Sequence, residues 1–226
     1  MASRAGNEAS GVHAVISPSA LADNARGLAG TADLRRDACG HGALACAPVL
    51  ADCGLRLLVD VDAPDAVRAL PAATTRVEGD FVDPAALWGL PGGSGRAVMS
   101  LHGSVLSTKP LRAREGVSYG YVFRAPADTH IALVCGGYAQ GIVREVGSRV
   151  RVRLHEASVP IVGRVAMDAC VIEIGDQQVA RGDEVTFFGD PLRGEPGLGD
   201  WVAVTGLTAI EIVSLVGARA RRRVGA

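Results

Sequence analysis

The period of the hydrophobic pattern changes near residue 92, and this change constrains the fold more than any other feature. Before it, short apolar runs at 12–16 and 55–61 alternate with alanine-rich stretches, which is typical of βα units. Beyond it, apolar and polar residues alternate, so that Val150, Val152 and Leu154 share one face of an expected strand. The chain should therefore combine an α/β region with a mainly β region.

We place the boundary at the turn-rich sequence L-P-G-G-S-G, residues 90–95. This gives a βα region at 11–92 and a β domain at 93–226. In the first region the pattern predicts a helix capped by Ser17 and begun by Pro18, a helix from about Ala43 to Cys53, a helix begun by Asp62 and a weak strand within 75–82. In the second it predicts strands within 148–154, 165–174 and 183–189, and one long helix over 202–216 that ends at Gly217.

Composition limits the classes of function. A hydrophobic content of 48% supplies a buried core, and a net charge of -1 gives no electrostatic reason to expect nucleic-acid binding. The apolar runs are too short to span a membrane. The first ten residues lack the apolar core of a signal peptide, and five cysteines, an odd number, suit reduced thiols. We expect a soluble, cytoplasmic protein.

Several motifs of the second region resemble one known family. They are E-G-V-S-Y-G (115–120), G-G-Y-A-Q-G (136–141), P-I-V-G-R-V-A-M-D-A (160–169), R-G-D-E-V-T-F-F-G (181–189) and the A-I-E-I-V helix. In order and spacing they resemble the C-terminal domain of alanine racemase, over residues 97–224. Upstream, H-A-V-I-S-P-S-A-L-A-D-N resembles the family's opening strand and helix. The resemblance implies that residues 12–16 add a strand to the β domain.

The sequence D-A-C-G-H-G-A resembles the family segment that carries the pyridoxal phosphate (PLP) lysine, but here that position is Arg35. An arginine stays protonated and is a poor nucleophile, so it can form no Schiff base. Lys109 is the only lysine in the sequence, and the resemblance places it on a surface strand. We therefore expect no covalently bound PLP.

Other cofactor positions are also altered. The resemblance puts Cys39 where a tyrosine contacts the cofactor phosphate, and a thiol is a weak hydrogen-bond donor. His41 lies in the same motif. Gly79 matches a phosphate-binding glycine, but the Asp80 carboxylate after it would repel a phosphate.

The length of the first region provides an independent argument. A (β/α)8 barrel takes about 250 residues, whereas only 92 residues precede the end of this region. The expected architecture is a truncated remnant of a (β/α)8 barrel followed by an alanine-racemase-like β domain.

The resemblance also implies that part of the active site survives. Tyr119 matches the second catalytic base, and Met167 and Asp168 match the pair beside the substrate carboxylate. In the family this half of the site comes from the neighbouring subunit. Gln140 and Phe123 replace an aspartate and a tyrosine near the pocket entrance. The expected partner is a second copy of the chain or a full-length racemase.

Three functions stay open. The preferred one is a racemase-like protein without activity of its own. The second is a residual PLP-dependent amino-acid racemase. The third is a metal-binding protein that uses Cys39, His41, Cys46 and Cys53, although their spacing fits no known zinc motif and Pro48 would disturb the helix that carries two of them. Buried thiols are the preferred interpretation of these cysteines.

Overall fold

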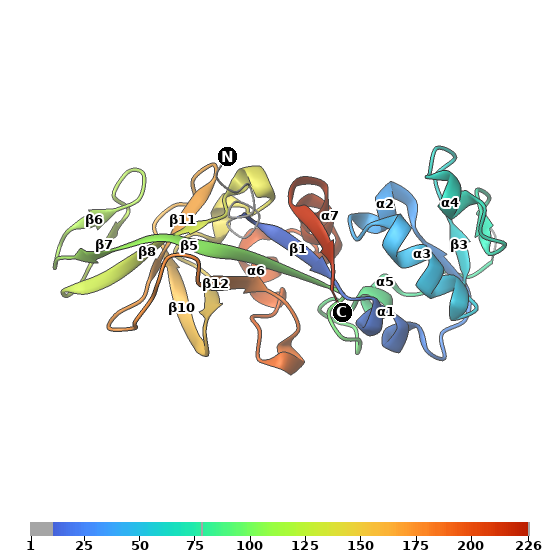
Figure 1. The fold of residues 1–226 in the computed structure, drawn as a ribbon, viewed down its shortest axis with the longest axis horizontal. Coiled ribbons are helices and arrows are strands. Elements are labelled where there is room, and N and C mark those ends of the chain that lie inside the picture. The colour runs from blue at the N-terminus through green and yellow to red at the C-terminus, as the bar shows by residue number, and fades with distance from the viewer. Residues whose placement is uncertain (1–10, 78, 226) are drawn as a thin grey trace, which may run out of the picture.

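The computed structural model describes residues 11–77 and 79–225. Eight of its strands pair into one sheet (Figure 1). Their order is β12-β9-β10-β11-β8-β5-β1-β13, and an additional β12–β5 pairing closes the first six into a barrel. The strands are β1 (His13–Ile16), β5 (Met99–Leu111), β8 (Thr129–Cys135), β9 (Arg151–Leu154), β10 (Ala157–Val162), β11 (Ala169–Glu173), β12 (Glu184–Phe188) and β13 (Arg221–Val224).

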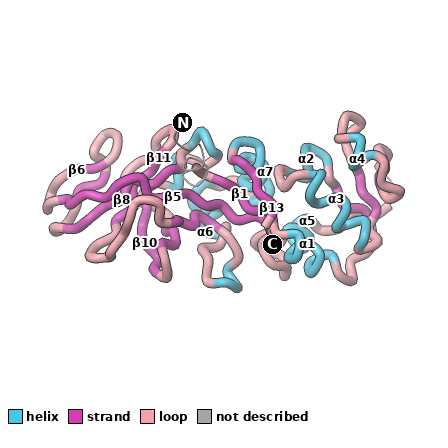
Figure 2. Tube along the Cα trace, in the orientation of Figure 1, coloured by secondary structure: helices cyan, strands magenta, loops and turns pink. Residues whose placement is uncertain are grey.

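A smaller parallel sheet, β2-β3-β4, lies at the end of the molecule away from the eight-stranded sheet, together with most helices of the first region (Figure 2). Phe81 forms a parallel bridge to Thr31 in β2. The strands are β2 (Thr31–Asp33), β3 (Arg56–Leu58) and β4 (Ala73–Thr74), and the helices are α1 (Pro18–Ala25), α2 (Arg35–Cys39), α3 (Ala43–Asp52), α4 (Asp65–Arg68) and α5 (Pro84–Trp88).

β1 ties the two parts together. It pairs antiparallel with β5, where His13 lies opposite His102, and parallel with β13. α1 follows directly, and the Ser17 hydroxyl caps it by accepting a hydrogen bond from the amide of Ala20 at 3.2 Å. The strand expected at 12–16 thus contributes to the eight-stranded sheet although in sequence it belongs to the βα region, 11–92.

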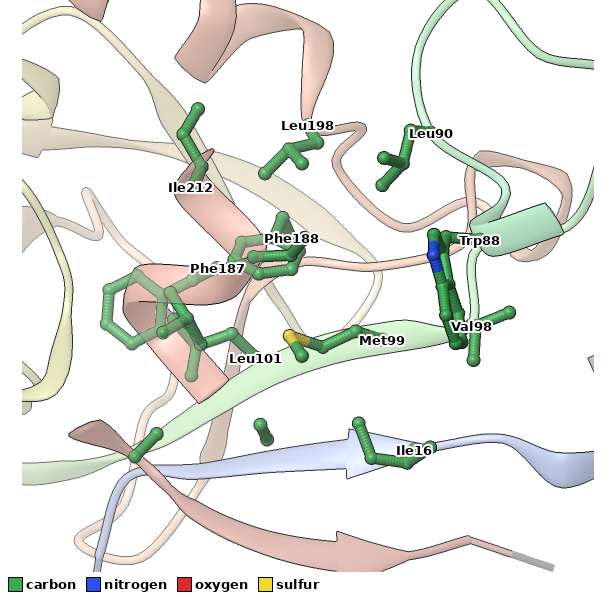
Figure 3. Packing of buried hydrophobic residues seen from close by; sticks show 14 of the residues in the cluster. Ile16, Trp88, Leu90, Val98, Met99, Leu101, Phe187, Phe188, Leu198 and Ile212 are labelled. Carbon is green, nitrogen blue, oxygen red and sulfur yellow. The ribbon is translucent and has the colours of Figure 1, made fainter. Parts of the chain in front are cut away.

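Short elements complete the β part: β6 (Gly116–Val117), β7 (Phe123–Arg124), the 3-10 turns η2 (Tyr138–Gln140), η3 (Arg144–Val146) and η4 (Pro191–Arg193), and the helices α6 (Gly199–Thr205) and α7 (Ala209–Arg219). The face predicted for β9 is confirmed, because Val150, Val152 and Leu154 are buried. One hydrophobic core runs through both parts and includes Ile16, Trp88 and Phe187 (Figure 3).

The predicted long helix over 202–216 is wrong. Gly206 adopts a left-handed conformation after α6, and Thr208 and Glu211 form a reciprocal capping box that starts α7. Gly217 lies inside α7 instead of capping it. Among the described residues no single helix is long and apolar enough to cross a membrane, although α6 and α7, bent by 100°, reach that length and apolarity together.

Other expected elements are shorter or shifted. α4 begins at Asp65 after Pro64, so Asp62 does not start it. α3 continues through Pro48, which is exposed. The expected weak strand within 75–82 is reduced to the bridge at Phe81, and β4 lies just before it.

Candidate functional site

Arg35, at the position of the expected cofactor lysine, follows the carboxyl end of β2 and is exposed. Its guanidinium donates to both carboxylate oxygens of Asp33, at 2.9 and 2.6 Å. This hydrogen bonding lowers the pKa of Asp33 and raises the pKa of Arg35. Arg35 is therefore held as a cation and cannot serve as an amine nucleophile or a general base.

Within α2, the residues after Arg35 form a left-handed turn instead of a right-handed helix. Four consecutive non-glycine residues, from Arg36 to Cys39, have φ values between 52° and 58°. Each such residue costs about 1–2 kcal/mol, so the surrounding structure must hold the turn. Part of this support is local: the Asp60 carboxylate accepts from the Arg36 amide at 2.6 Å, and the Asp37 carboxylate accepts from the Ala43 amide at 2.7 Å.

The C-terminal segment supplies the rest of the support. Ser214 in α7 donates its hydroxyl to the Cys39 carbonyl at 3.1 Å. Arg222 in β13 donates to the Gly40 carbonyl at 3.1 Å and forms an ion pair with Asp37 at 2.5 Å. The β part thus fixes the segment that resembles the cofactor-lysine motif.

His41 is buried beneath this turn. Its Nδ1–H donates to the Ala38 carbonyl at 3.0 Å, and its ring stacks on Trp88 with centroids 4.2 Å apart. Burial lowers the pKa of His41 to about 4, so the imidazole is neutral at physiological pH. The arrangement is that of a packed core residue.

The cysteines do not form a metal cluster with His41. Burial raises the pKa of Cys46 to about 12, and the Cys53 thiol donates to the Ala22 carbonyl at 4.0 Å. Within residues 11–77 and 79–225 there is no group of three or more His, Cys, Asp or Glu side chains that could hold a metal ion. Nothing in the described geometry favours a metal-binding function.

A cavity of about 270 Å³ lies at the carboxyl end of β2, lined by Asp33, Cys39, Phe81, Val82, Pro84, Leu87, Trp88 and Ile210. It contains no amine. Lys109 lies on β5, is 58% exposed and faces Glu115 at 3.8 Å. The residues at this cavity do not fit a cofactor held through a Schiff base.

Gly79 does not join this cavity. It precedes Phe81, which bridges Thr31 at the amino end of β2, whereas Arg35 follows the carboxyl end. The side chain of Arg56 occupies the space beside Gly79, where an added Cβ would lie 2.3 Å from a guanidinium nitrogen. A phosphate at Gly79 would therefore lie near the amino end of β2, whereas Arg35 lies at its carboxyl end.

Tyr119 lies in the loop between β6 and β7 and is 81% exposed. The neighbouring Ser118 donates its hydroxyl to the Arg164 carbonyl at 2.6 Å, which ties this loop to the segment leading to Met167 and Asp168. Met167 and Asp168 are exposed as well, and Gln140 donates to the Asp168 carboxylate at 3.1 Å. The structure thus places the three residues of the expected surviving half-site on neighbouring loops.

The two halves of the expected site lie far apart in the chain's own structure. The β6–β7 hairpin lies at the left end of the long axis, whereas α2 lies well to the right, beyond α7 (Figure 1). One chain therefore cannot bring Tyr119 to the α2 turn.

Comparisons with known proteins identify the family that the second region resembles. The family model of the alanine racemase C-terminal domain matches residues 98–224. Alanine racemase of Mycobacterium tuberculosis (strain ATCC 25618 / H37Rv) is 41% identical over 118 residues, 51% of this chain and 31% of that protein. Alanine racemase of Frankia casuarinae is 41% identical over 145 residues, 64% of this chain and 36% of that protein. The matched part thus spans about a third of the length of these curated relatives.

Solved structures extend the likeness of fold to the first region. Alanine racemase from D-cycloserine producing Streptomyces lavendulae superposes with a TM-score of 0.80 at 20% identity, covering 96% of this chain and 97% of that chain. The enzyme from Bartonella henselae, whose structure has covalently bound pyridoxal phosphate, gives a TM-score of 0.76 at 16% identity, covering 96% of this chain and all of that one. Because the family model matches more than half of the sequence, the chain belongs to the alanine racemase family.

Proposed function

We propose that this protein is an alanine-racemase-family subunit that binds no PLP covalently, has no racemase activity of its own and contributes Tyr119, Met167 and Asp168 to the site of a partner. The observation that carries the proposal is the contrast between its two ends. Arg35 is locked to Asp33 where a reactive lysine would be needed, whereas Tyr119 is exposed at the far end of the molecule.

The first region fits a shortened (β/α)8 barrel. In a closed barrel the last strand pairs with the first, and Phe81 takes that place beside β2. On the other side of β2 the order is β3 and then β4, and no further described strand pairs with β4. The shortening is internal: only six residues separate Thr74 from Phe81, so the middle strands of a barrel have no sequence to form them.

The preferred partner is a full-length racemase subunit. A homodimer would place each Tyr119 beside a second Arg35, and neither site would have a lysine. A mixed dimer would place Tyr119 beside a complete barrel. In that site the chain's own phenol hydroxyl would transfer the proton, and the exposed Met167–Asp168 loop would line the pocket.

The test is trans-complementation. The chain is co-expressed with a full-length racemase in which the tyrosine of the V-S-Y-G motif is changed to phenylalanine, and mixed species are isolated through a tag on each partner. We expect racemisation to return with the wild-type chain and with Tyr121→Phe, an exposed tyrosine of the same loop, but not with Tyr119→Phe. If the chains fail to co-purify, or if Tyr119→Phe is fully active in the mixed species, the proposal is wrong.

A further inference from the structure

A separate cavity of about 460 Å³ lies where the two parts of the chain meet, between the α5–β5 linker and the β12–α6 segment. Five large apolar side chains define it: Phe188 and Trp88 lie on opposite sides of a space, Met99 lies along one edge, and Leu90 and Leu198 lie along the other (Figure 3). Its volume is in the range of small-molecule sites, which often occur at domain junctions. It is distinct from the region of Tyr119 and from Arg35.

The walls are fixed. His41 stacks on one face of Trp88 at 4.2 Å, and Trp201 packs edge-on against Phe188 at 5.3 Å. The linker is braced by Asn24, whose amide nitrogen donates to the carbonyls of Leu87 and Arg96 at 3.0 and 2.8 Å. The cavity is therefore preformed, so a ligand would not have to order its walls.

The polarity of the lining restricts the ligand. Among the residues that line the cavity, Asp190 alone carries a charge, and its carboxylate already accepts from Arg96 and from the Leu192 amide. No lining side chain is a cation. An organic anion would meet only this carboxylate. A cation would have to compete with Arg96, which already pairs with Asp190 at 3.3 Å. The lining therefore favours an uncharged ligand.

Trp88 provides one directional group. The residue is 1% exposed, and no described residue accepts a hydrogen bond from its indole N–H. The indole nitrogen lies at the end of the ring nearest Leu90, at the edge of the space (Figure 3). A donor at the edge of the cavity with no acceptor among the described residues can be satisfied by a ligand that supplies one.

We propose that this cavity binds an uncharged aromatic molecule that inserts between Trp88 and Phe188 and accepts one hydrogen bond from the Trp88 indole. The proposal is independent of the subunit role, because it needs neither Tyr119 nor a partner chain.

Titration calorimetry with three probes of matched size tests each part of the proposal. Acetophenone has a ring and a neutral acceptor, ethylbenzene lacks the acceptor, and benzoate carries a charge. We expect 1:1 binding, with affinity that decreases from acetophenone to ethylbenzene to benzoate. Trp88→Phe should lower the affinity for acetophenone about three- to tenfold, because one hydrogen bond is lost. It should change the affinity for ethylbenzene less than about twofold. Equal losses for both probes would contradict the hydrogen bond.

Filling the space should abolish binding. Leu198→Trp adds a ring to the cavity, and we expect at least tenfold weaker binding of acetophenone and ethylbenzene, with no change in Leu44→Trp, an exposed site outside the cavity. If Leu198→Trp does not fold, Gly199→Leu provides a second filling variant, because a Cβ there meets no heavy atom within 4 Å. The proposal is overturned if the wild-type chain binds no probe saturably, if benzoate binds as tightly as acetophenone, or if a folded filling variant binds like the wild type.

Discussion

Gly217 of α7 packs directly on Gly40 of the left-handed turn, so closely that a Cβ on Gly217 would lie 2.0 Å from the Gly40 carbonyl oxygen. A Cβ on Gly40 would in turn lie 2.9 Å from the Val213 carbonyl oxygen. With the Ser214–Cys39 hydrogen bond, this contact joins the β part to the motif that resembles the cofactor-lysine segment.

The close approach predicts the effect of Gly217→Ala. Alanine is the better helix former by about 1 kcal/mol, but the clash with backbone should cost more, about 1–3 kcal/mol. We expect a net loss in the free energy of unfolding, measured by urea denaturation. Gly199→Ala is the control: a Cβ there meets nothing within 4 Å, so stability should be unchanged or slightly higher. Equal stability of the two variants would contradict the contact.

We also predict that PLP forms no stoichiometric covalent bond with the chain. The reason is the Arg35–Asp33 ion pair at the lysine position and the remote, exposed Lys109. After incubation with PLP and borohydride reduction, peptide mass mapping should detect no more than partial modification. Lys109→Arg is the control. A full pyridoxyl adduct that disappears in this variant, and that substrate competes away, would support the residual-enzyme alternative instead.

The sequence predicted elements with strong local signals and missed those set by distant contacts. Ser17 and Pro18 gave the start of α1, and alternation gave the buried face of β9. The break between α6 and α7 had a readable signal, because Thr208 and Glu211 fit the S/T-x-x-E capping box, but the apolar period continued across it and favoured one helix.

In the candidate site, too, residues with a local sequence signal were predicted, and residues joined by distant contacts were missed. Motif resemblance located Arg35 and Tyr119, which are defined by their neighbours in sequence. Ser214 contacts Cys39 across 175 positions, and Arg222 contacts Gly40 across 182. No periodicity or spacing connects such distant residues, and the glycine that permits the contact, Gly217, resembled a helix end.

The buried His41 predicts how stability depends on pH. Its pKa is about 4 in the folded protein and about 6.5 when unfolded, so the unfolded chain binds the proton more tightly. The stability that the protein gains by burying His41 in its neutral form is fully present above about pH 6.5 and is lost as the pH falls toward 4. A depression of this size corresponds to about 3 kcal/mol.

The measurement is the free energy of unfolding at several pH values between 7 and 4. His41→Phe keeps a ring on Trp88 but cannot titrate, so its curve should be flatter than that of the wild type. His102 leaves a residual slope, because burial lowers its pKa too. A His41→Phe curve parallel to the wild type would refute the assignment.

Finally, the first region should open more readily than the β part. Its parallel sheet has strands of three, three and two residues, and no described strand covers β4, whereas β12–β5 pairing leaves the barrel without a free edge. In native-state hydrogen exchange we expect the amides of residues 42–82 to exchange through smaller opening free energies than those of residues 130–190. The turn at 36–40 should be an intermediate case, because Ser214 and Arg222 hold it from the β part. Ser214→Ala removes one of these bonds, so it should speed exchange in the turn and leave the barrel strands unchanged. Protection of residues 42–82 equal to that of residues 130–190 would show that the short sheet is as stable as the closed barrel.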